Sequence, residues 1–297
     1  MFLVSSTPAL AVAPTLPEGH LLFQVACDYR VNDRQLLGVD LENENLIEIG
    51  VGSGNDPENG DCASQGAMLP GTDWFYYVDW DGRDDTLVRV DVITGETEEI
   101  GVMEDEGSYV GLYSLAIGPN GNAYALSYDY VFGVNLDTGD LVQITAADFY
   151  GINSGYPYGF AYDRVTEKFY IAEDGGYEIH ELNVPTGELT YVTENSDFWI
   201  GSFAFDANGD FWFNGDDAKI RRGSLDNYDN SANVLETGEI FLDGEEIYSE
   251  SLGLALPAAD DDSEGLAPTG STDVSALAAL AGLAGLAAVA IRRRASR

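Results

Sequence analysis

Apolar and polar residues alternate in short runs along most of the chain, and polar turns separate these runs. In the clearest example, Leu87–Val92 is followed by Thr94-Gly95 and then by a second alternating run that ends at Ile100-Gly101. Alternation with a period of two on both sides of a tight turn is typical of a β-hairpin. Glycine can adopt the left-handed conformation that such a turn requires. The pattern therefore predicts antiparallel strands.

This hairpin recurs without gaps. Equivalent first strands begin at residues 36, 87, 131 and 179, and a weaker copy begins at residue 220. The fifth residue of each copy is short and polar: Asp40, Asp91, Asn135, Asn183 and Ser224. A short polar side chain just before a turn can accept hydrogen bonds from the backbone that reverses there. We interpret this set as turn caps rather than as catalytic groups.

A second set of short apolar segments lies outside the hairpins, and each segment contains an alanine. Successive alanines are separated by 49, 45, 43 and 51 residues: Ala67, Ala116, Ala161, Ala204 and Ala255. A further strand usually follows across a polar turn such as Asn120-Gly121. Four strands in about 40 to 50 residues is the period of a β-propeller blade. Small residues suit the innermost strands, because those strands converge on the axis.

The two ends of the repeat complete each other. The last alanine opens a unit that has no hairpin after it, whereas residues 21–50 form a unit without an inner strand. If residues 252–256 pair beside residues 22–27, the ring closes without an open sheet edge. We therefore expect an all-β fold, a five-bladed β-propeller over residues 20–257 that is closed by its N- and C-terminal strands. A sixth, diverged blade and an open β-solenoid are the alternatives.

The repeat resembles that of secreted propellers whose units read x-Val-Asp-x-x-Thr-Gly, a motif that specifies fold far better than function. Propeller ligands usually meet the mouth formed by the loops that lead into the inner strands. Here those loops carry aromatic and polar residues: Gln65, Tyr109, Tyr113, Tyr156, Tyr158, Trp199, Tyr248 and Glu250. Aromatic faces with a few polar partners suit sugars or peptides. The alternative is that these aromatic side chains fill the seams between blades.

Patterns typical of catalysis or metal binding are scarce. Neither His20 nor His180 has a second histidine at metal-ligand spacing, and the predicted mouth offers one carboxylate, Glu250, where a glycosidase needs two. The segment Asp79–Asp85 looks somewhat like a calcium loop, but its glycine comes too early and no glutamate closes it. We interpret it as a solvated hairpin tip, with a calcium site as the alternative. The sequence predicts a protein that is not an enzyme and needs no cofactor.

The chain is strongly acidic. It contains 13 basic and 52 acidic residues, which give a net charge of −39. This charge makes nucleic acid and anionic membrane surfaces poor partners. A hydrophobic content of 45% is nevertheless sufficient for a sizeable core. Cys27 and Cys62 favour a disulfide in an exported chain, with two unpaired buried thiols as the alternative.

Residues 266–297 contain three features in a fixed order. Leu266-Ala267-Pro268-Thr269-Gly270 comes first, an apolar segment over residues 274–291 follows, and Arg292-Arg293-Arg294 lies near the end. Eighteen residues form about 27 Å of helix, barely enough to cross a bilayer. The arginines would stay on the cytoplasmic side.

This arrangement resembles the cell-wall sorting signal of Gram-positive surface proteins, in the variant with alanine at the second position. The resemblance covers residues 266–297 only. It implies that a sortase cleaves between Thr269 and Gly270 and joins Thr269 to peptidoglycan, with Leu266, Ala267 and Pro268 as recognition residues. The alternative is a plain C-terminal membrane anchor in which the pentapeptide is part of a linker.

The remaining segments agree with export. Residues 1–13 contain small-x-small cleavage patterns but no basic start, so we interpret them as a residual or truncated signal peptide. Residues 258–265 form an acidic linker that spans at most roughly 28 Å. The sequence thus predicts a secreted, cell-wall-anchored propeller with a non-catalytic recognition surface for a glycan, a peptide or a protein. An extracellular propeller enzyme, such as a lactonase or a polysaccharide-cleaving enzyme, and a structural coat protein are the alternatives.

Overall fold

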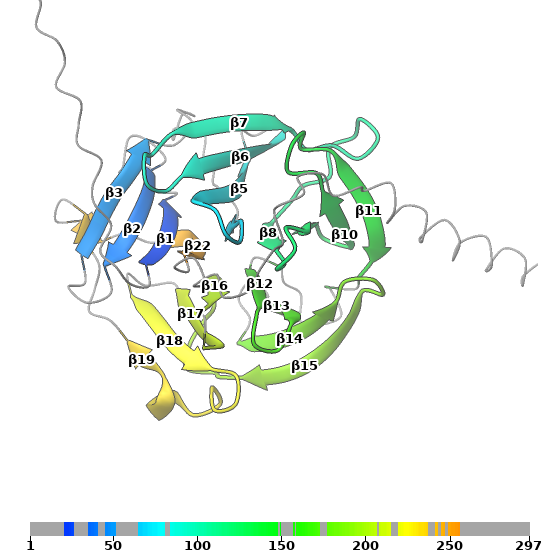
Figure 1. Ribbon diagram of the computed structural model, residues 1–297. Coiled ribbons are helices and arrows are strands. Elements are labelled where there is room, and N and C mark those ends of the chain that lie inside the picture. Colours follow the sequence, from blue (N-terminus) through cyan, green and yellow to red (C-terminus); the bar gives the residue numbers. More distant parts are fainter. Residues whose placement is uncertain are drawn as a thin grey trace, which may run out of the picture.

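The strands of this protein are arranged as a propeller. The computed structural model describes residues 21–26, 35–40, 45–51, 65–80, 84–147, 149, 157, 159–172, 177–206, 208–214, 219–236, 241–242, 245–246 and 249–255. These residues form five four-stranded antiparallel sheets and one two-stranded ribbon. Figure 1 shows the four-stranded sheets placed around a common centre. The prediction of an all-β propeller fold is confirmed.

Four of the sheets are built from strands that are consecutive in the chain. The first contains β4 (Ala67–Met68), β5 (Trp74–Trp80), β6 (Asp85–Asp91) and β7 (Thr97–Val102). The second contains β8 (Ser114–Ile117), β9 (Ala123–Leu126), β10 (Tyr130–Val134) and β11 (Leu141–Ala146). The third contains β12 (Gly159–Asp163), β13 (Lys168–Ala172), β14 (Glu178–Asn183) and β15 (Glu188–Glu194). The fourth contains β16 (Ser202–Phe205), β17 (Asp210–Asn214), β18 (Ile220–Ser224) and β19 (Leu235–Glu236), with a 3-10 helix at Ser231–Asn233 before β19. The ribbon consists of β20 (Phe241–Leu242) and β21 (Glu245–Glu246).

The fifth sheet joins the two ends of the chain. Its strand order is β22-β1-β2-β3, with bounds β22 (Ser249–Ala255), β1 (Leu21–Ala26), β2 (Gln35–Asp40) and β3 (Asn45–Val51). β22 pairs antiparallel with β1, so that Leu254 lies opposite Leu22. The predicted pairing between the N-terminal and C-terminal segments is therefore confirmed. This pairing gives β1 a neighbour on each side.

The inner strands form a closed cycle of contacts. β4 contacts β8, β8 contacts β12, β12 contacts β16, β16 contacts β22, and β22 contacts β4. Each inner strand contains one of the regularly spaced alanines, as the repeat predicts: Ala67, Ala116, Ala161, Ala204 and Ala255. Their small side chains allow five backbones to approach one axis.

The hairpin turns have the predicted chemistry. Oδ1 of Asp91 accepts hydrogen bonds from the N–H groups of Ile93 and Thr94, both at 2.9 Å. Gly95 has a φ of 74°, and its N–H donates to the backbone carbonyl of Asp91 at 2.7 Å. Oδ1 of Asn135 likewise accepts from the N–H of Asp137 at 2.9 Å. The interpretation of this polar set as turn caps is confirmed at both positions.

Two of these turns also lie against the preceding sheet. A Cβ on Gly187, whose φ is 71°, would lie 2.2 Å from the carbonyl oxygen of Ala146 at the end of β11. A Cβ on Gly139, whose φ is 82°, would lie 2.8 Å from the carbonyl oxygen of Gly101 in β7. Glycine is therefore required here for its backbone conformation and for close packing between sheets.

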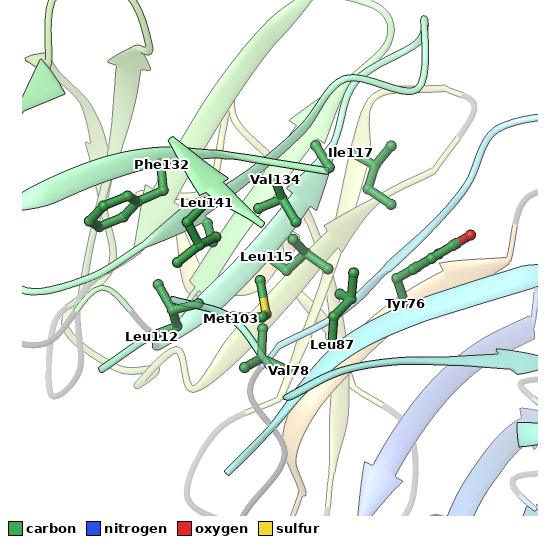
Figure 2. Packing of buried hydrophobic residues seen from close by; sticks show 12 residues of the cluster. Tyr76, Val78, Leu87, Met103, Leu112, Leu115, Ile117, Phe132, Val134 and Leu141 are labelled. Carbon is green, nitrogen blue, oxygen red and sulfur yellow. The ribbon is translucent and has the colours of Figure 1, made fainter. Parts of the chain in front are cut away.

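The hydrophobic core lies between neighbouring sheets. In Figure 2, Val78 of β5 and Leu87 of β6 lie near Leu115 of β8, with Met103 among them. All four side chains are at most 1% exposed. A second cluster, between the β12–β15 and β16–β19 sheets, is rich in aromatic rings: Tyr170, Phe203, Phe205, Phe211, Phe213 and Tyr228. Part of the aromatic content of the chain thus fills the seams between sheets.

Several predicted segments lie outside the described residues. They are the signal segment 1–13, Cys27, Cys62, the linker 258–265, the sorting motif Leu266–Gly270 and the apolar segment 274–291. Within the part of the chain that the structure describes, no helix is long and apolar enough to cross a membrane.

Candidate functional site

The predicted mouth is the face at which the chain enters the inner strands. The structure describes the side chains of four predicted mouth residues: Gln65, Tyr109, Tyr113 and Trp199. Glu250 lies in β22, of which the backbone alone is described. Tyr156, Tyr158 and Tyr248 lie outside the described residues.

Gln65 closes the centre of the ring instead of lining an open mouth. Its Nε2 donates to the carbonyl oxygens of Phe160 and Phe203 at 2.5 and 2.7 Å. Its Oε1 accepts from the N–H groups of the same two residues at 3.1 and 3.3 Å. The side chain is 1% exposed. Gln65 is therefore a plug that connects three sheets, and this corrects its predicted role as an accessible ligand contact.

The edges of the inner strands explain this use of a glutamine. Each inner strand pairs with its own sheet on one side, so the N–H and C=O groups of its other edge face the axis and require partners. A primary amide offers donors and an acceptor in one plane and can satisfy two such edges at once. The backbone of Gln65 adds a fourth sheet, since its carbonyl accepts from the N–H of Leu115 at 3.0 Å. Nearby, Oγ of Ser114 donates to the carbonyl of Pro157 at 2.7 Å.

Several tyrosines lie at the mouth end of the β8–β11 sheet. Tyr109 is 51% exposed and Tyr130 is 40% exposed. Tyr113 is half-buried, and its ring meets Tyr128 edge-on at a centroid distance of 4.7 Å. Tyr128 and Tyr130 were not among the predicted mouth residues. They follow β9, whose last residue pairs with the first residue of β8, and so lie at the same end of the sheet.

The loop that carries Tyr109 is well anchored. Asp105 and Ser108 exchange backbone hydrogen bonds at 3.1 and 3.0 Å, and the two residues between them have positive φ. Oδ2 of Asp85 accepts from the N–H of Leu112 at 2.9 Å. A fixed loop presents an aromatic side chain at a lower entropic cost of binding than a mobile loop does.

Trp199 lies in the loop before β16 and is half-buried. Asn195 organises this loop: its Nδ2 donates to the carbonyl of Tyr228 at 2.6 Å and its Oδ1 accepts from the N–H of Asp197 at 3.0 Å. The guanidinium of Arg221 lies 5.0 Å from the centroid of the Phe198 ring. Phe198 also packs against the aromatic cluster of this sheet. The loop is therefore largely devoted to packing at the seam.

A cavity of about 60 Å³, here called the basal cavity, is bordered by Gln65. The regularly spaced alanines form much of its wall, together with residues at the C-terminal ends of the inner strands: Ala67, Met68, Ala116, Ile117, Ala161, Tyr162, Ala204 and Phe205. Arg164, in the turn after β12, also lines it. The cavity thus extends from the plug toward the end of the ring opposite the predicted mouth.

The described residues contain little catalytic chemistry. His180 is 6% exposed; its Nε2 lies 2.8 Å from Oε2 of Glu178, and its ring packs edge-on against Tyr191. Its environment is that of a packed strand residue. Among the described residues, no group of three or more histidine, cysteine or acidic side chains could hold a metal ion.

The segment predicted as a solvated hairpin tip is partly buried. Asp79 and Asp85 are 2% and 1% exposed, while residues 81–83 lie outside the described residues. Asp85 holds the loop of Leu112. Because both carboxylates are buried, the prediction of a solvated tip is wrong for these two residues.

Comparison with known proteins supports the fold alone. No family model matches the chain, and no curated protein shows significant sequence similarity to it. Among solved structures, one from a nidogen/laminin complex has 11% sequence identity and a TM-score of 0.54, over 80% of this chain and 99% of that chain. A structural genomics protein of unknown function from Bacteroides thetaiotaomicron has 13% identity and a TM-score of 0.50, over 73% of this chain and 64% of that one, which is less than two thirds of its length. TolB from Acinetobacter baumannii has 14% identity and a TM-score of 0.49, over 81% and 67% of the two chains.

Proposed function

We propose that the protein is a five-bladed propeller held on the bacterial cell wall, and that it presents a non-catalytic recognition surface to the exterior. The observation that carries this proposal is the direction of β22. This strand occupies the same place in its sheet as β4, β8, β12 and β16 occupy in theirs. It therefore begins at the mouth face and ends, at Ala255, at the basal face. The segment that carries the proposed sorting signal follows from that end.

This direction supports display. A chain joined to peptidoglycan through Thr269 would be attached on the side of the basal face, where β22 ends. The mouth face, with Tyr109 and Tyr130, would then point away from the wall. The order of pentapeptide, apolar segment and arginines supports attachment by a sortase.

Two features of the mouth support binding rather than catalysis. The plug at Gln65 blocks the axis, so a ligand would lie on the surface rather than in a deep channel. The exposed tyrosines provide flat apolar faces with hydroxyl groups, which suit stacking on a sugar ring or contact with a peptide. The nidogen/laminin structure is that of a complex between proteins, so a protein ligand belongs beside a glycan among the candidates.

Binding can be tested with glycan and peptide arrays. The matched variants are Tyr109→Ala at the mouth and Tyr191→Ala on the outer strand β15, because these two tyrosines are 51% and 53% exposed. Loss of one aromatic contact should weaken binding by about tenfold. We expect this loss for Tyr109→Ala and unchanged binding for Tyr191→Ala. Equal effects of the two variants, or no ligand at high protein concentration, would remove the mouth as the binding surface.

Attachment can be tested separately by expressing the chain in a Gram-positive host with a matching sortase. The wild type should appear in the fraction released by muralytic digestion, without residues 270–297. Thr269→Ala should remain in the detergent-soluble fraction with its tail intact. A wild-type chain that keeps its tail in the presence of the active sortase would refute wall attachment and leave the binding test unaffected.

A further inference from the structure

One long stretch of the chain contains no basic residue. No lysine, arginine or histidine occurs between Arg89 and Arg164. This stretch includes the loop before β8 and the whole β8–β11 sheet. The loops at the mouth end of that sheet, residues 103–113 and 127–129, nevertheless carry several carboxylates: Glu104, Asp105, Glu106 and Asp129. These loops therefore present negative charge at neutral pH and contain no basic side chain that balances it.

The two most exposed tyrosines of this sheet are anchored at one seam. Loop 103–113 begins and ends with Met103 and Leu112 in the hydrophobic cluster between the β4–β7 and β8–β11 sheets (Figure 2), and Tyr109 lies between these anchors. Tyr130, the first residue of β10, has its ring centroid 6.2 Å from that of Phe132, which belongs to the same cluster. Both aromatic rings are thus presented from a rigid base.

Each of these tyrosines has an exposed carboxylate close to it in the chain. Glu106 lies three residues before Tyr109, and Asp129 directly precedes Tyr130. The ring of Tyr109 is also held against the loop, because a Cβ on Gly111 would lie 3.5 Å from its hydroxyl oxygen. We call these groups, together with the exposed Glu104, the acidic tyrosine surface: Glu104, Glu106, Tyr109, Asp129 and Tyr130.

The protein itself shows which cation suits an aromatic ring beside a carboxylate. Three of its guanidinium groups lie over a ring and also pair with a carboxylate: Arg89 lies 4.4 Å from the Trp74 centroid and pairs with Glu98, Arg221 lies 5.0 Å from Phe198 and pairs with Glu236, and Arg222 lies 5.3 Å from Trp212 and pairs with Asp210. The face of the ring and the carboxylate both attract the positive charge. The acidic tyrosine surface offers the same two kinds of group, and its own loops contain no arginine.

Other ligands use this combination less completely. An uncharged sugar gains stacking on the rings but no attraction from the net negative charge. An acidic ligand is repelled by a chain of net charge −39. A lysine ammonium is a compact, strongly hydrated charge, whereas a guanidinium is planar, stacks on a ring and binds a carboxylate through two N–H groups. The chemistry of the surface therefore favours arginine.

We propose that the acidic tyrosine surface binds a positively charged peptide segment, with arginine side chains stacked on Tyr109 and Tyr130 and paired with the carboxylates beside them. This inference rests on the proposed recognition function. It names the ligand of that function as an arginine-containing peptide rather than a glycan.

The test is a titration of the ¹⁵N-labelled full chain with an N-acetylated tetra-arginine amide at about 0.15 M salt, followed through the amide signals of Tyr109 and Tyr130. The tetra-citrulline peptide has nearly the same shape without the charge, and the tetra-lysine peptide has the charge without the planar group. We expect saturable shifts with tetra-arginine, at least about tenfold weaker binding of tetra-citrulline, and weaker binding of tetra-lysine. Equal affinity for the arginine and citrulline peptides would overturn the proposal. Equal affinity for the arginine and lysine peptides would show that net charge alone is recognised, and would overturn it as well.

Matched variants locate the binding surface. Tyr109→Ala and Glu106→Gln should each weaken tetra-arginine binding by about threefold to tenfold. Tyr191→Ala and Glu188→Gln make the same changes at exposed positions of β15, in a sheet that already contains Lys168, and should leave the affinity within about twofold of the wild type. Equal losses at the two places would show non-specific attraction to an acidic protein and would contradict the surface.

The array experiment separates this inference from the proposed function. A neutral glycan that binds the wild type and is lost in Tyr109→Ala, with no preference for arginine over citrulline, would refute the basic peptide and leave the recognition surface in place. Absence of both peptide and glycan binding would remove the inference and the proposed function together.

Discussion

Replacing Gln65 should destabilise the whole ring, because this one side chain forms hydrogen bonds to two other sheets. Gln65→Met keeps the length of the side chain but removes four hydrogen bonds to Phe160 and Phe203. A buried neutral hydrogen bond contributes a net of about 0.5–1.5 kcal/mol, so four of them amount to about 2–6 kcal/mol. Water that enters from the basal cavity can replace some of these bonds, which favours the lower half of that range.

The assay combines urea unfolding with amide hydrogen exchange. The free energy of unfolding should fall by about 2–4 kcal/mol, and the amide hydrogens of Phe160 and Phe203 should exchange faster, because they lose their acceptor. Gln143→Met is the control, since Gln143 is an exposed glutamine in β11. If Gln65→Met and Gln143→Met have the same free energy of unfolding, the hydrogen bonds of Gln65 do not stabilise the ring.

A charged replacement tests the same geometry through pH. Gln65→Glu introduces a carboxyl that faces two carbonyl oxygens, and the ionised form cannot donate to them. Burial and these oxygens should raise the pKa of the introduced carboxyl above its unfolded value of about 4.3. The variant should therefore be least stable, relative to wild type, above the raised pKa, and the difference should shrink as the pH falls through it. A stability difference that is constant between neutral and acidic pH would contradict this expectation.

Two further predictions concern the hairpin turns, and urea unfolding tests both. Gly187→Ala should lower the free energy of unfolding clearly more than Gly71→Ala does. Both glycines have positive φ. However, a Cβ on Gly187 would lie 2.2 Å from the carbonyl oxygen of Ala146, whereas no atom lies within 4 Å of a Cβ on Gly71. The backbone strain shared by both variants is about 1–2 kcal/mol, so equal losses would show that the sheets do not need this close contact. Asp91→Ala removes two cap hydrogen bonds and should lower the free energy of unfolding by about 0.5–2 kcal/mol. Asp91→Asn should be nearly neutral, as Asn135 already caps an equivalent turn, and an equal loss in both variants would assign the effect to charge instead.

Much of the architecture was predictable because it is local and repeated. The Asp or Asn before each Thr-Gly turn, and the glycine itself, act within a few residues of one another, so their pattern predicts the hairpins directly. The alanines at 43 to 51 residue spacing identified the inner strands, since crowding at an axis restricts side-chain size in every unit alike. The pairing of β1 with β22 followed from two incomplete units at opposite ends of the chain.

The site depends on contacts between units, and a repeat pattern does not contain them. The sequence does hold a trace of the plug: two residues before the central alanine, four units have Ser114, Gly159, Ser202 and Gly253, and Gln65 is the exception. Its partners could not be deduced, because they lie 95 and 138 residues away and are backbone groups without a sequence signal. Short-range chemistry thus specified the strands and turns, whereas closure of the ring determined what blocks its axis and which side chains line the cavity that remains.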